Sequence, residues 1–239
     1  FENREQLKTF SLAMNFKTLA KEISSSEETA PPRITVEHEI IEEEERLSEV
    51  LKNLSKEKSI CLDIETDQLN PLEASVVGIG LGAQADKIYY IPFNGKMDSD
   101  KALNLLKPFF KNSSLGFYGH NVKYDAHILA NCGIDDVRII GDTMIASYLL
   151  NPHMRQNSLD SLALAHFNFK KIALKDLIGT GKKQKSLGDL PIETVAHYCS
   201  EDVSFTIRLK EVFDRSLKEN DLFKLYETME VPLISILLR

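Results

Sequence analysis

Apolar and polar residues alternate most regularly at residues 59–66, Ser-Ile-Cys-Leu-Asp-Ile-Glu-Thr. Aliphatic side chains occupy every second position there, which is the period of a β-strand. The pattern predicts a half-buried strand with Asp63 and Glu65 together on the other face. Alternate residues of a strand are roughly 6–7 Å apart, so the two carboxylates repel each other unless a cation lies between them. A divalent metal would satisfy both acids, whereas an exposed turn at the end of the strand is the simpler alternative.

Further apolar runs predict the other elements. Strands are expected at 76–82, 87–92, 114–118 and 137–140, after a short extended segment that begins at Val36. One helix starts in the acidic run 42–45 and ends near Leu54, and others are expected at 98–111, 121–131, 142–150, 158–167, 191–218 and 221–239. Three meandering strands followed by strands that alternate with helices are typical of an α/β domain with a mixed central sheet flanked by helices. The glycines at 78, 80 and 82 do not predict a nucleotide site, because no helix follows them to hold a phosphate.

Linker composition suggests how the chain is divided. Residues 4–22 have helical spacing, and the polar run at 24–32 ends in two prolines. We therefore expect residues 1–33 to be the tail of a preceding domain and a linker, and residues 34–218 to form the main domain. The chain starts at Phe1 and ends inside a helical pattern, so residues 219–239 are expected to be the truncated start of a further domain.

Composition and charge narrow the function. With 43% hydrophobic and 27% charged residues, the chain can form a sizeable core. The net charge of −7 argues against general attraction to nucleic acid or anionic membranes, so binding would need a local basic patch. No apolar run approaches the roughly 20 residues of a membrane span, and we expect no membrane partner. The three cysteines are odd in number and lack metal-type spacing, which favours reduced thiols in a cytoplasmic protein.

Two further acids interrupt apolar helix faces. Asp125 lies four residues after Asn121, on the same face of the helix expected at 121–131. Asp202 is the one charged member of an apolar stripe in the last long helix, formed by Val195, Tyr198, Phe205, Leu209 and Val212. An acid buried in an apolar face needs a partner, either the cation of a structural ion pair or a metal. With Asp63 and Glu65, these are four acids on a strand and two helices, which fit oxygen ligands that converge on hard divalent cations.

Three segments resemble the motifs of a known family. Residues 62–67 (LDIETD), 119–125 (GHNVKYD) and 198–202 (YCSED) are similar in order and spacing to the exonuclease motifs of the proofreading 3′→5′ exonuclease domain of bacterial DNA polymerase I. The resemblance covers residues 36–218. Residues 227–233 are similar to the first helix of the polymerase domain, and residues 7–22 to the end of the 5′-nuclease domain. No polymerase motif is present, so the resemblance implies no synthesis by this chain.

The resemblance implies an RNase H-like 3′→5′ exonuclease fold and phosphodiester hydrolysis with two divalent metal ions, Mg²⁺ or Mn²⁺, with Zn²⁺ as an option at one site. It assigns Asp63, Glu65 and Asp202 to the ion that generates the attacking hydroxide. Asp63 and, through water, Asp125 hold the other ion, which stabilises the leaving 3′ oxygen. Tyr198 orients the attacking water.

The implied substrate is a single-stranded or frayed 3′ end of DNA, bound by a monomer whose polymerase domain lies in the same chain. Leu69 matches a residue that wedges between the last bases. Leu174 stands where the family can have an aromatic residue, which weakens the expectation of base stacking there but not of the chemistry. The basic loop at 179–185 is a candidate for contacts with phosphates, and its alternative is a set of solvated lysines. The residues expected to contact the substrate are Thr66, Leu69, Asn121, Leu174, Lys182, Lys183 and Lys185.

Two other functions fit the same residues. A ribonuclease D-like exonuclease that acts on RNA shares the four acids and the tyrosine, although the polymerase-like continuation favours DNA. The domain could instead be a catalytically silent spacer between nuclease and polymerase modules.

His197 and Tyr198 both precede Asp202 at spacings that suit a water-orienting residue. On a helix, a residue four positions back is rotated only about 40° from Asp202, and one five positions back about 140°. Because Pro191 suits a first turn, the helix includes both residues, and Tyr198 is expected to face the acids. His197 is expected at the surface, on a solvent-facing polar stripe with Glu201, Ser204, Arg208 and Glu211.

Overall fold

The computed structural model describes Leu7, Phe10 and residues 34–154, 156–181 and 184–238. Internal contacts divide the chain into two units, Phe1–Ile34 and Thr35–Arg239. Leu7 and Phe10 of the first unit are helical, and the linker predicted at 24–32 lies outside the described residues. The second unit contains the sheet, the hydrophobic cores and all four acids.

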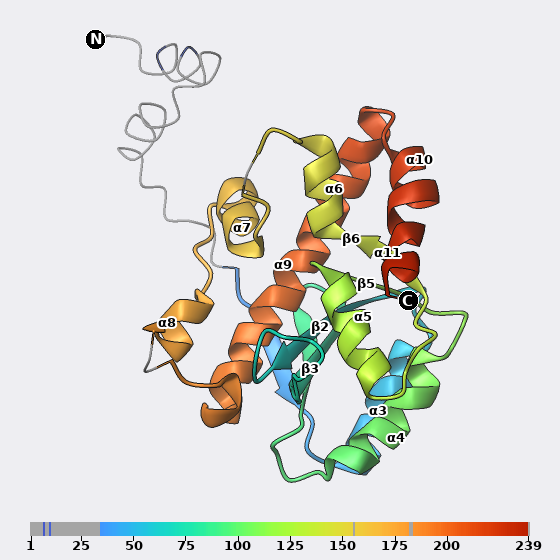
Figure 1. Ribbon diagram of the computed structural model, residues 1–239, viewed down its shortest axis with the longest axis vertical. Coiled ribbons are helices and arrows are strands. Elements are labelled where there is room, and N and C mark those ends of the chain that lie inside the picture. Colours follow the sequence, from blue (N-terminus) through green and yellow to red (C-terminus); the bar gives the residue numbers. More distant parts are fainter. Residues whose placement is uncertain (1–6, 8–9, 11–33, 155, 182–183, 239) are drawn as a thin grey trace. The chain divides into compact units, whose positions relative to one another are not determined.

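A mixed sheet forms the centre of the second unit (Figure 1). Among the described residues it has six strands, in the order β1, β4, β3, β2, β5 and β6. The strand β2 pairs antiparallel with β3 and parallel with β5. The predicted mixed sheet is therefore confirmed. Its strands are β1 (Glu37–Ile40), β2 (Ser59–Thr66), β3 (Val76–Gln84), β4 (Lys87–Pro92), β5 (Gly116–Gly119) and β6 (Ile139–Asp142).

Helices flank the sheet, and every helix predicted after residue 34 is present. The sequence did not predict α8, because five residues are too few to show a helical period. The helix expected at 221–239 is divided into three consecutive pieces. Within the described ranges, no helix is both long and apolar enough to cross a membrane. The elements are α3 (Glu44–Leu54), α4 (Ser99–Phe110), α5 (Val122–Asn131), α6 (Thr143–Leu150), α7 (Leu159–Phe167), α8 (Leu174–Ile178), η2 (Leu187–Asp189), α9 (Ile192–Glu219), α10 (Phe223–Leu225), η3 (Tyr226–Glu230) and α11 (Val231–Leu237).

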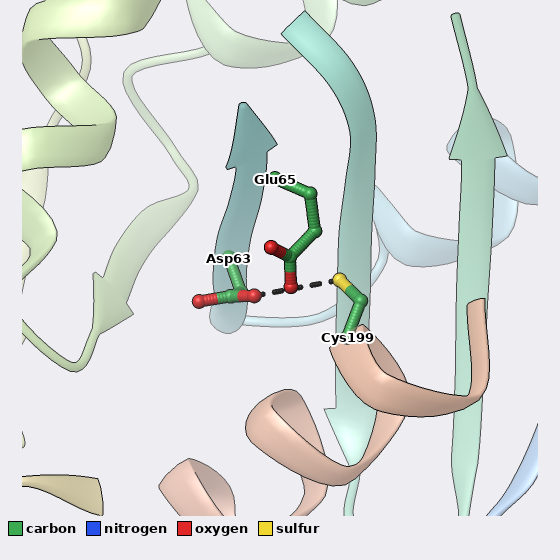
Figure 2. A group of neighbouring side chains, drawn as sticks. All are labelled: Asp63, Glu65 and Cys199. Carbon is green, nitrogen blue, oxygen red and sulfur yellow. Dashed lines mark hydrogen bonds between the residues drawn. The ribbon is translucent and has the colours of Figure 1, made fainter. Parts of the chain in front are cut away.

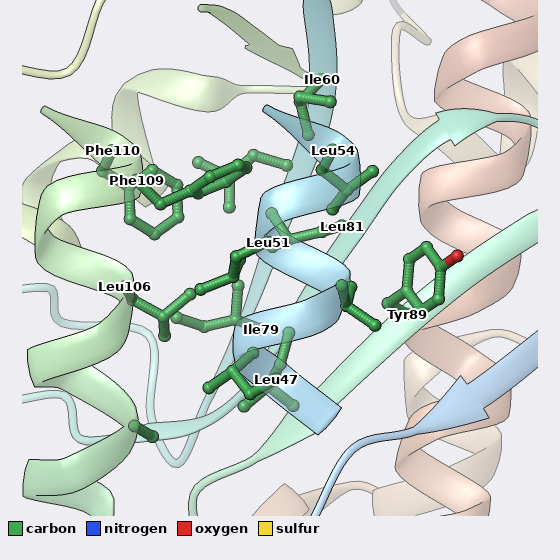
Figure 3. Packing of buried hydrophobic residues seen from close by; sticks show 14 of the residues in the cluster. Leu47, Leu51, Leu54, Ile60, Ile79, Leu81, Tyr89, Leu106, Phe109 and Phe110 are labelled. Atoms are coloured by element: carbon green, nitrogen blue, oxygen red, sulfur yellow. The ribbon is translucent and has the colours of Figure 1, made fainter. Parts of the chain in front are cut away.

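Two hydrophobic clusters cover opposite faces of the sheet. One packs residues of α3 and α4 against Ile60 and Leu81 (Figure 3). The other packs α9 against the opposite face and includes Cys61. The prediction of a half-buried β2 was therefore wrong in one respect, because α9 covers its second face. Asp63 and Glu65 consequently point into the space between the sheet and α9.

Glycines in β3 allow α9 to lie close to the sheet. A Cβ atom at Gly80 would lie 2.5 Å from Sγ of Cys199, and one at Gly82 would lie 2.9 Å from a methyl group of Val203. Real Cβ atoms do not approach other atoms so closely, so larger residues would push the helix away. Gly80 and Gly82 therefore serve helix packing, and Gly78 makes room for the ring of Tyr90, which agrees with the rejection of a nucleotide site.

The polar stripe predicted on α9 faces solvent only in part, because His197 and Glu211 are exposed whereas Glu201 and Ser204 are buried. Glu201 is 6% exposed and accepts a hydrogen bond from the backbone N–H of Ile172 at 3.1 Å. Ser204 is fully buried and donates to the carbonyl oxygen of Ala85 at 2.5 Å. His197 is exposed, as predicted. The prediction was wrong for Glu201 and Ser204 because the segments around Ile172 and Ala85, outside the helices and strands, cover this part of the helix.

Candidate active site

Asp63 and Glu65 lie side by side on β2, as its strand period predicted, and α9 brings Cys199 to them (Figure 2). One side-chain ligand atom of each of these three residues lies within 4.8 Å of the others. Sγ of Cys199 donates a hydrogen bond to Oδ2 of Asp63 at 3.4 Å. Sequence reasoning missed this thiol, although Cys199 precedes Asp202 by three residues and therefore shares its helix face.

The two carboxylates on β2 are crowded and poorly solvated. Burial raises the pKa of Asp63. Burial is the main cause that raises the pKa of Glu65 well above its ordinary value, and the neighbouring charge of Asp63 raises it further. Oε1 of Glu65 is buried and makes no hydrogen bond with the described residues. A cation between the two acids would relieve both effects.

Asp125 lies on α5 next to β2 and is 4% exposed. Its Oδ1 accepts a hydrogen bond from the backbone N–H of Ile64 at 3.1 Å. Burial, followed by the charge of Asp63, raises the pKa of Asp125 well above its ordinary value. The expectation that Asn121 shares a helix face with Asp125 was wrong, because α5 begins at Val122. Asn121 precedes the helix in a left-handed conformation, with φ of 64°, and is exposed.

Asp142 fixes the start of α5 from outside the helix. Its carboxylate accepts hydrogen bonds from the backbone N–H groups of Asn121 and Val122 at 3.1 and 2.9 Å. It also caps α6 by accepting from Met144 and Ile145 at 2.8 and 3.3 Å. A capping role for α6 can be recognised from an Asp before a helix. The second cap joins elements that are separate in sequence, so no local pattern indicates it.

Asp202 faces the site from α9 and meets a buried lysine. Its Oδ1 contacts Nζ of Lys171, whose side chain is 0% exposed. The same Nζ lies 3.5 Å from Oδ1 of Asp160 and 5.2 Å from the ring centroid of Tyr198. Burial lowers the pKa of Lys171, and the surrounding acids act in the opposite direction. Sequence reasoning missed Lys171, which appears there only as one of two adjacent lysines.

The geometry of α9 separates Tyr198 from His197. The helix begins at Ile192 and contains both residues, as predicted. Tyr198 is half-buried, and burial followed by the charges of Glu65 and Asp63 raises its pKa. The side chain of His197 is 47% exposed. Tyr198 is thus on the side of the acids and His197 is on the surface.

A pocket of about 590 Å³ adjoins the acids and contains several of the residues predicted to bind substrate. It is lined by Glu65, Thr66, Leu69, Leu174 and Lys185 among others. The side chain at position 69 is strongly exposed, with 82% of its surface accessible. The exposed residue 121 is not part of the lining, and the predicted lysines Lys182 and Lys183 lie outside the described residues.

Comparison with known proteins identifies the family. A family model described as a 3′-5′ exonuclease matches residues 38–218. The chain belongs to this family. A DNA polymerase I from Chloroflexus aurantiacus is 31% identical over 214 residues, which make up 87% of this chain and 22% of that protein. The chain therefore spans under a quarter of the length of this relative.

Solved structures share the fold of this exonuclease family member. Escherichia coli RNase D, an exoribonuclease involved in structured RNA processing, matches with a TM-score of 0.68 and 14% identity, over 85% of this chain and 51% of RNase D. Brucella melitensis NrnC with bound Mg²⁺ matches with a TM-score of 0.60 and 18% identity, over 85% of this chain and 93% of NrnC. These matches confirm the predicted exonuclease fold.

The acids of this exonuclease domain fit a divalent metal ion. Oε1 of Glu65 is a buried oxygen without a hydrogen-bond donor in the described part of the chain, whereas Oδ1 of Asp202 is paired with Nζ of Lys171. Carboxylate oxygens are the ligands that Mg²⁺ and Mn²⁺ prefer. The thiol of Cys199 adds a softer ligand atom of the kind that Zn²⁺ accepts.

Proposed function

We propose that this chain is a metal-dependent 3′→5′ exonuclease that removes nucleotides from DNA 3′ ends as the proofreading part of a DNA polymerase. The observation that carries the proposal is the pair Asp63 and Glu65, two crowded acids, one half-buried and one buried, beside a pocket large enough for a nucleotide. Membership of the 3′-5′ exonuclease family and similarity to DNA polymerase I support it. We assign the four acids to two divalent ions, Mg²⁺ or Mn²⁺, with Zn²⁺ as an option at one of them.

Bound metal ions would activate water and neutralise charge at the phosphate. Asp63, Glu65 and Asp202 would hold one ion, and Asp63 with Asp125 the other. Tyr198 keeps its proton at neutral pH because burial raises its pKa. Its hydroxyl group can therefore orient the attacking water by a hydrogen bond, but it does not act as the base.

The pocket provides contacts for a single strand. Leu69 is exposed and apolar and would wedge between the last bases, whereas Leu174 supplies an aliphatic wall. Thr66 has its hydroxyl fixed by the hydroxyl of Tyr124 at 2.8 Å, which leaves the pocket edge ordered. Lys185 would approach the backbone phosphates.

The same proposal describes the rest of the chain. Residues 1–33 would be the tail of a preceding domain with a linker, and residues 219–239 the start of the polymerase domain in the same polypeptide. Support comes from the DNA polymerase I relative, of which this chain covers 22%. The complete protein would act as a cytoplasmic monomer with no membrane partner.

Digestion of single-stranded DNA labelled at either end tests the proposal. In Mg²⁺ or Mn²⁺, a 3′ label should be released as mononucleotide at once, while a 5′ label should appear in a ladder of shortened strands. EDTA should stop both, and Asp63→Asn should lower the rate about 100-fold or more. A folded wild-type chain that digests no strand in either metal would indicate the silent spacer instead.

A ribonuclease D-like activity is the second candidate, because the fold matches E. coli RNase D with a TM-score of 0.68. An RNA strand of the same sequence distinguishes the two. Faster digestion of RNA than of DNA would replace the proofreading assignment with RNA processing.

A further inference from the structure

Lys171 places a fully buried ammonium group among the acids. Its Nζ contacts Oδ1 of Asp202 in an ion pair and lies 3.5 Å from Oδ1 of Asp160. Its side chain is 0% exposed. Lysine is almost never fully buried unless it is paired, because taking the ammonium group out of water is unfavourable. The acids must therefore supply the compensation.

Two contacts fix the backbone around Lys171 on α9. The N–H group of Ile172 donates to Oε2 of Glu201 at 3.1 Å. The rings of Phe169 and Phe205 are 4.6 Å apart at their centroids. Glu201 and Phe205 belong to the helix that carries Asp202, so the lysine is directed at the site by the same helix. A change in the position of Lys171 would therefore involve its side chain and not its backbone.

We infer that Lys171 is a built-in cation that neutralises the Asp202 side of the site when no metal is bound, and that an incoming divalent ion must displace it. This inference rests on the metal site proposed above. Oδ1 of Asp202 cannot bind both the ammonium group and a metal ion closely. Asp160 offers the displaced ammonium group a second carboxylate at 3.5 Å, and its side chain is 49% exposed. The lysine therefore has a place to move to without leaving the protein.

Two measurable effects follow. The ammonium group stabilises the metal-free protein by offsetting repulsion among buried acids. It also lowers the affinity for metal, because every binding event includes breaking the contact between Lys171 and Asp202. Lys171 thus sets the metal concentration at which the site fills, and it does so through the ligands, without touching the substrate.

Calorimetric titration of Mn²⁺ into the metal-free full chain tests the inference. Lys171→Met keeps a long apolar side chain and removes the charge, and Lys170→Met is the matched control because Lys170 is adjacent and exposed. Lys171→Met should bind Mn²⁺ at least about tenfold more tightly than wild type, and Lys170→Met should stay within about twofold. Adding Asp63→Asn to Lys171→Met should abolish the gain. In thermal melts, Lys171→Met should have a lower Tm in EDTA and a larger rise in Tm with Mn²⁺.

Equal Mn²⁺ affinity in wild type and Lys171→Met, or no Mn²⁺ binding by either, overturns the inference. Lys171→Gln provides a second neutral variant in case the methionine does not fit. If both variants are unfolded with and without Mn²⁺, the lysine is a structural ion-pair partner and the inference fails, whereas folding only in Mn²⁺ supports it. A tenfold gain in a chain that digests no DNA would refute the nuclease proposal and leave this inference standing.

Discussion

Asp142 connects the starts of α5 and α6, and its replacement by alanine tests how far one side chain holds the site together. Its two carboxylate oxygens accept hydrogen bonds from four backbone N–H groups, two at each helix start, at 2.8 to 3.3 Å. The residue is 2% exposed, so water has little access to replace these bonds. The start of α5 lies one turn before Asp125, which links this cap to the acids.

The expected loss of stability follows from the number of caps. Replacing an N-cap Asp by Ala lowers the free energy of unfolding by about 0.5–2 kcal/mol. Asp142→Ala removes two caps and leaves four backbone N–H groups without their acceptor, one of them buried and three partly buried, so we expect a loss of about 2–4 kcal/mol. Burial raises the pKa of Asp142, and relief from burying this charge keeps the loss below the sum of four separate hydrogen bonds. A domain is stable by about 5–15 kcal/mol, so the variant should still fold.

Urea unfolding followed by circular dichroism, in EDTA, measures this loss. Asp98→Ala is the matched control, because Asp98 caps α4 through two hydrogen bonds at 3.0 and 3.2 Å and is exposed. The control should lose about 1 kcal/mol, and Asp142→Ala at least twice as much with an unchanged m-value. Equal losses in the two variants would refute the idea that Asp142 holds the start of α5.

Three further predictions concern the acids, the water and the strand. Below about pH 4.5 Glu65 is protonated in both states, and because burial raises its folded-state pKa, metal-free stability should fall as pH rises above that value. Glu65→Gln should reduce this fall in urea titrations at about pH 5 and 7, and the part that remains comes from Asp63 and Asp125, whose pKa values are also raised by burial. Tyr198→Phe should slow hydrolysis about 10- to 100-fold with unchanged Mn²⁺ binding, whereas His197→Ala should match wild type, and the reverse result would reassign the water. Replacing the three lysines of the loop 179–185 by Ala should weaken single-strand binding and flatten its salt dependence, and unchanged affinity at low salt would exclude the loop.

Periodicity within one element predicted the parts of the site that depend on that element alone. Asp63 and Glu65 share a strand face because successive side chains of a strand alternate. Tyr198 faces the acids and His197 faces solvent because the helix begins before both of them. These inferences need no knowledge of which element packs where.

Contacts between distant segments could not be predicted in the same way. A single apolar stripe on α9 implied one buried side, but the irregular segments around Ile172 and Ala85 also pack on the helix, so Glu201 and Ser204 are buried on the side expected to face water. Asn121 was expected to lie on the same helix face as Asp125, but its left-handed conformation places it before the helix. Its N–H group is held by Asp142, 21 residues away in sequence.

The same distinction explains why the acids could be found from the sequence and their resident cation could not. An acid within an apolar pattern is expected to be buried, and a buried carboxylate is unfavourable unless a positive charge lies next to it. Which cation compensates the acid depends on the fold, and here the irregular segment between α7 and α8 brings Lys171 to Asp202. A permanent, inaccessible partner would make the acids purely structural. On the inference drawn above, the ammonium group moves towards Asp160, which lies 3.5 Å away and is half exposed, and the carboxylate of Asp202 would then be available to a divalent ion.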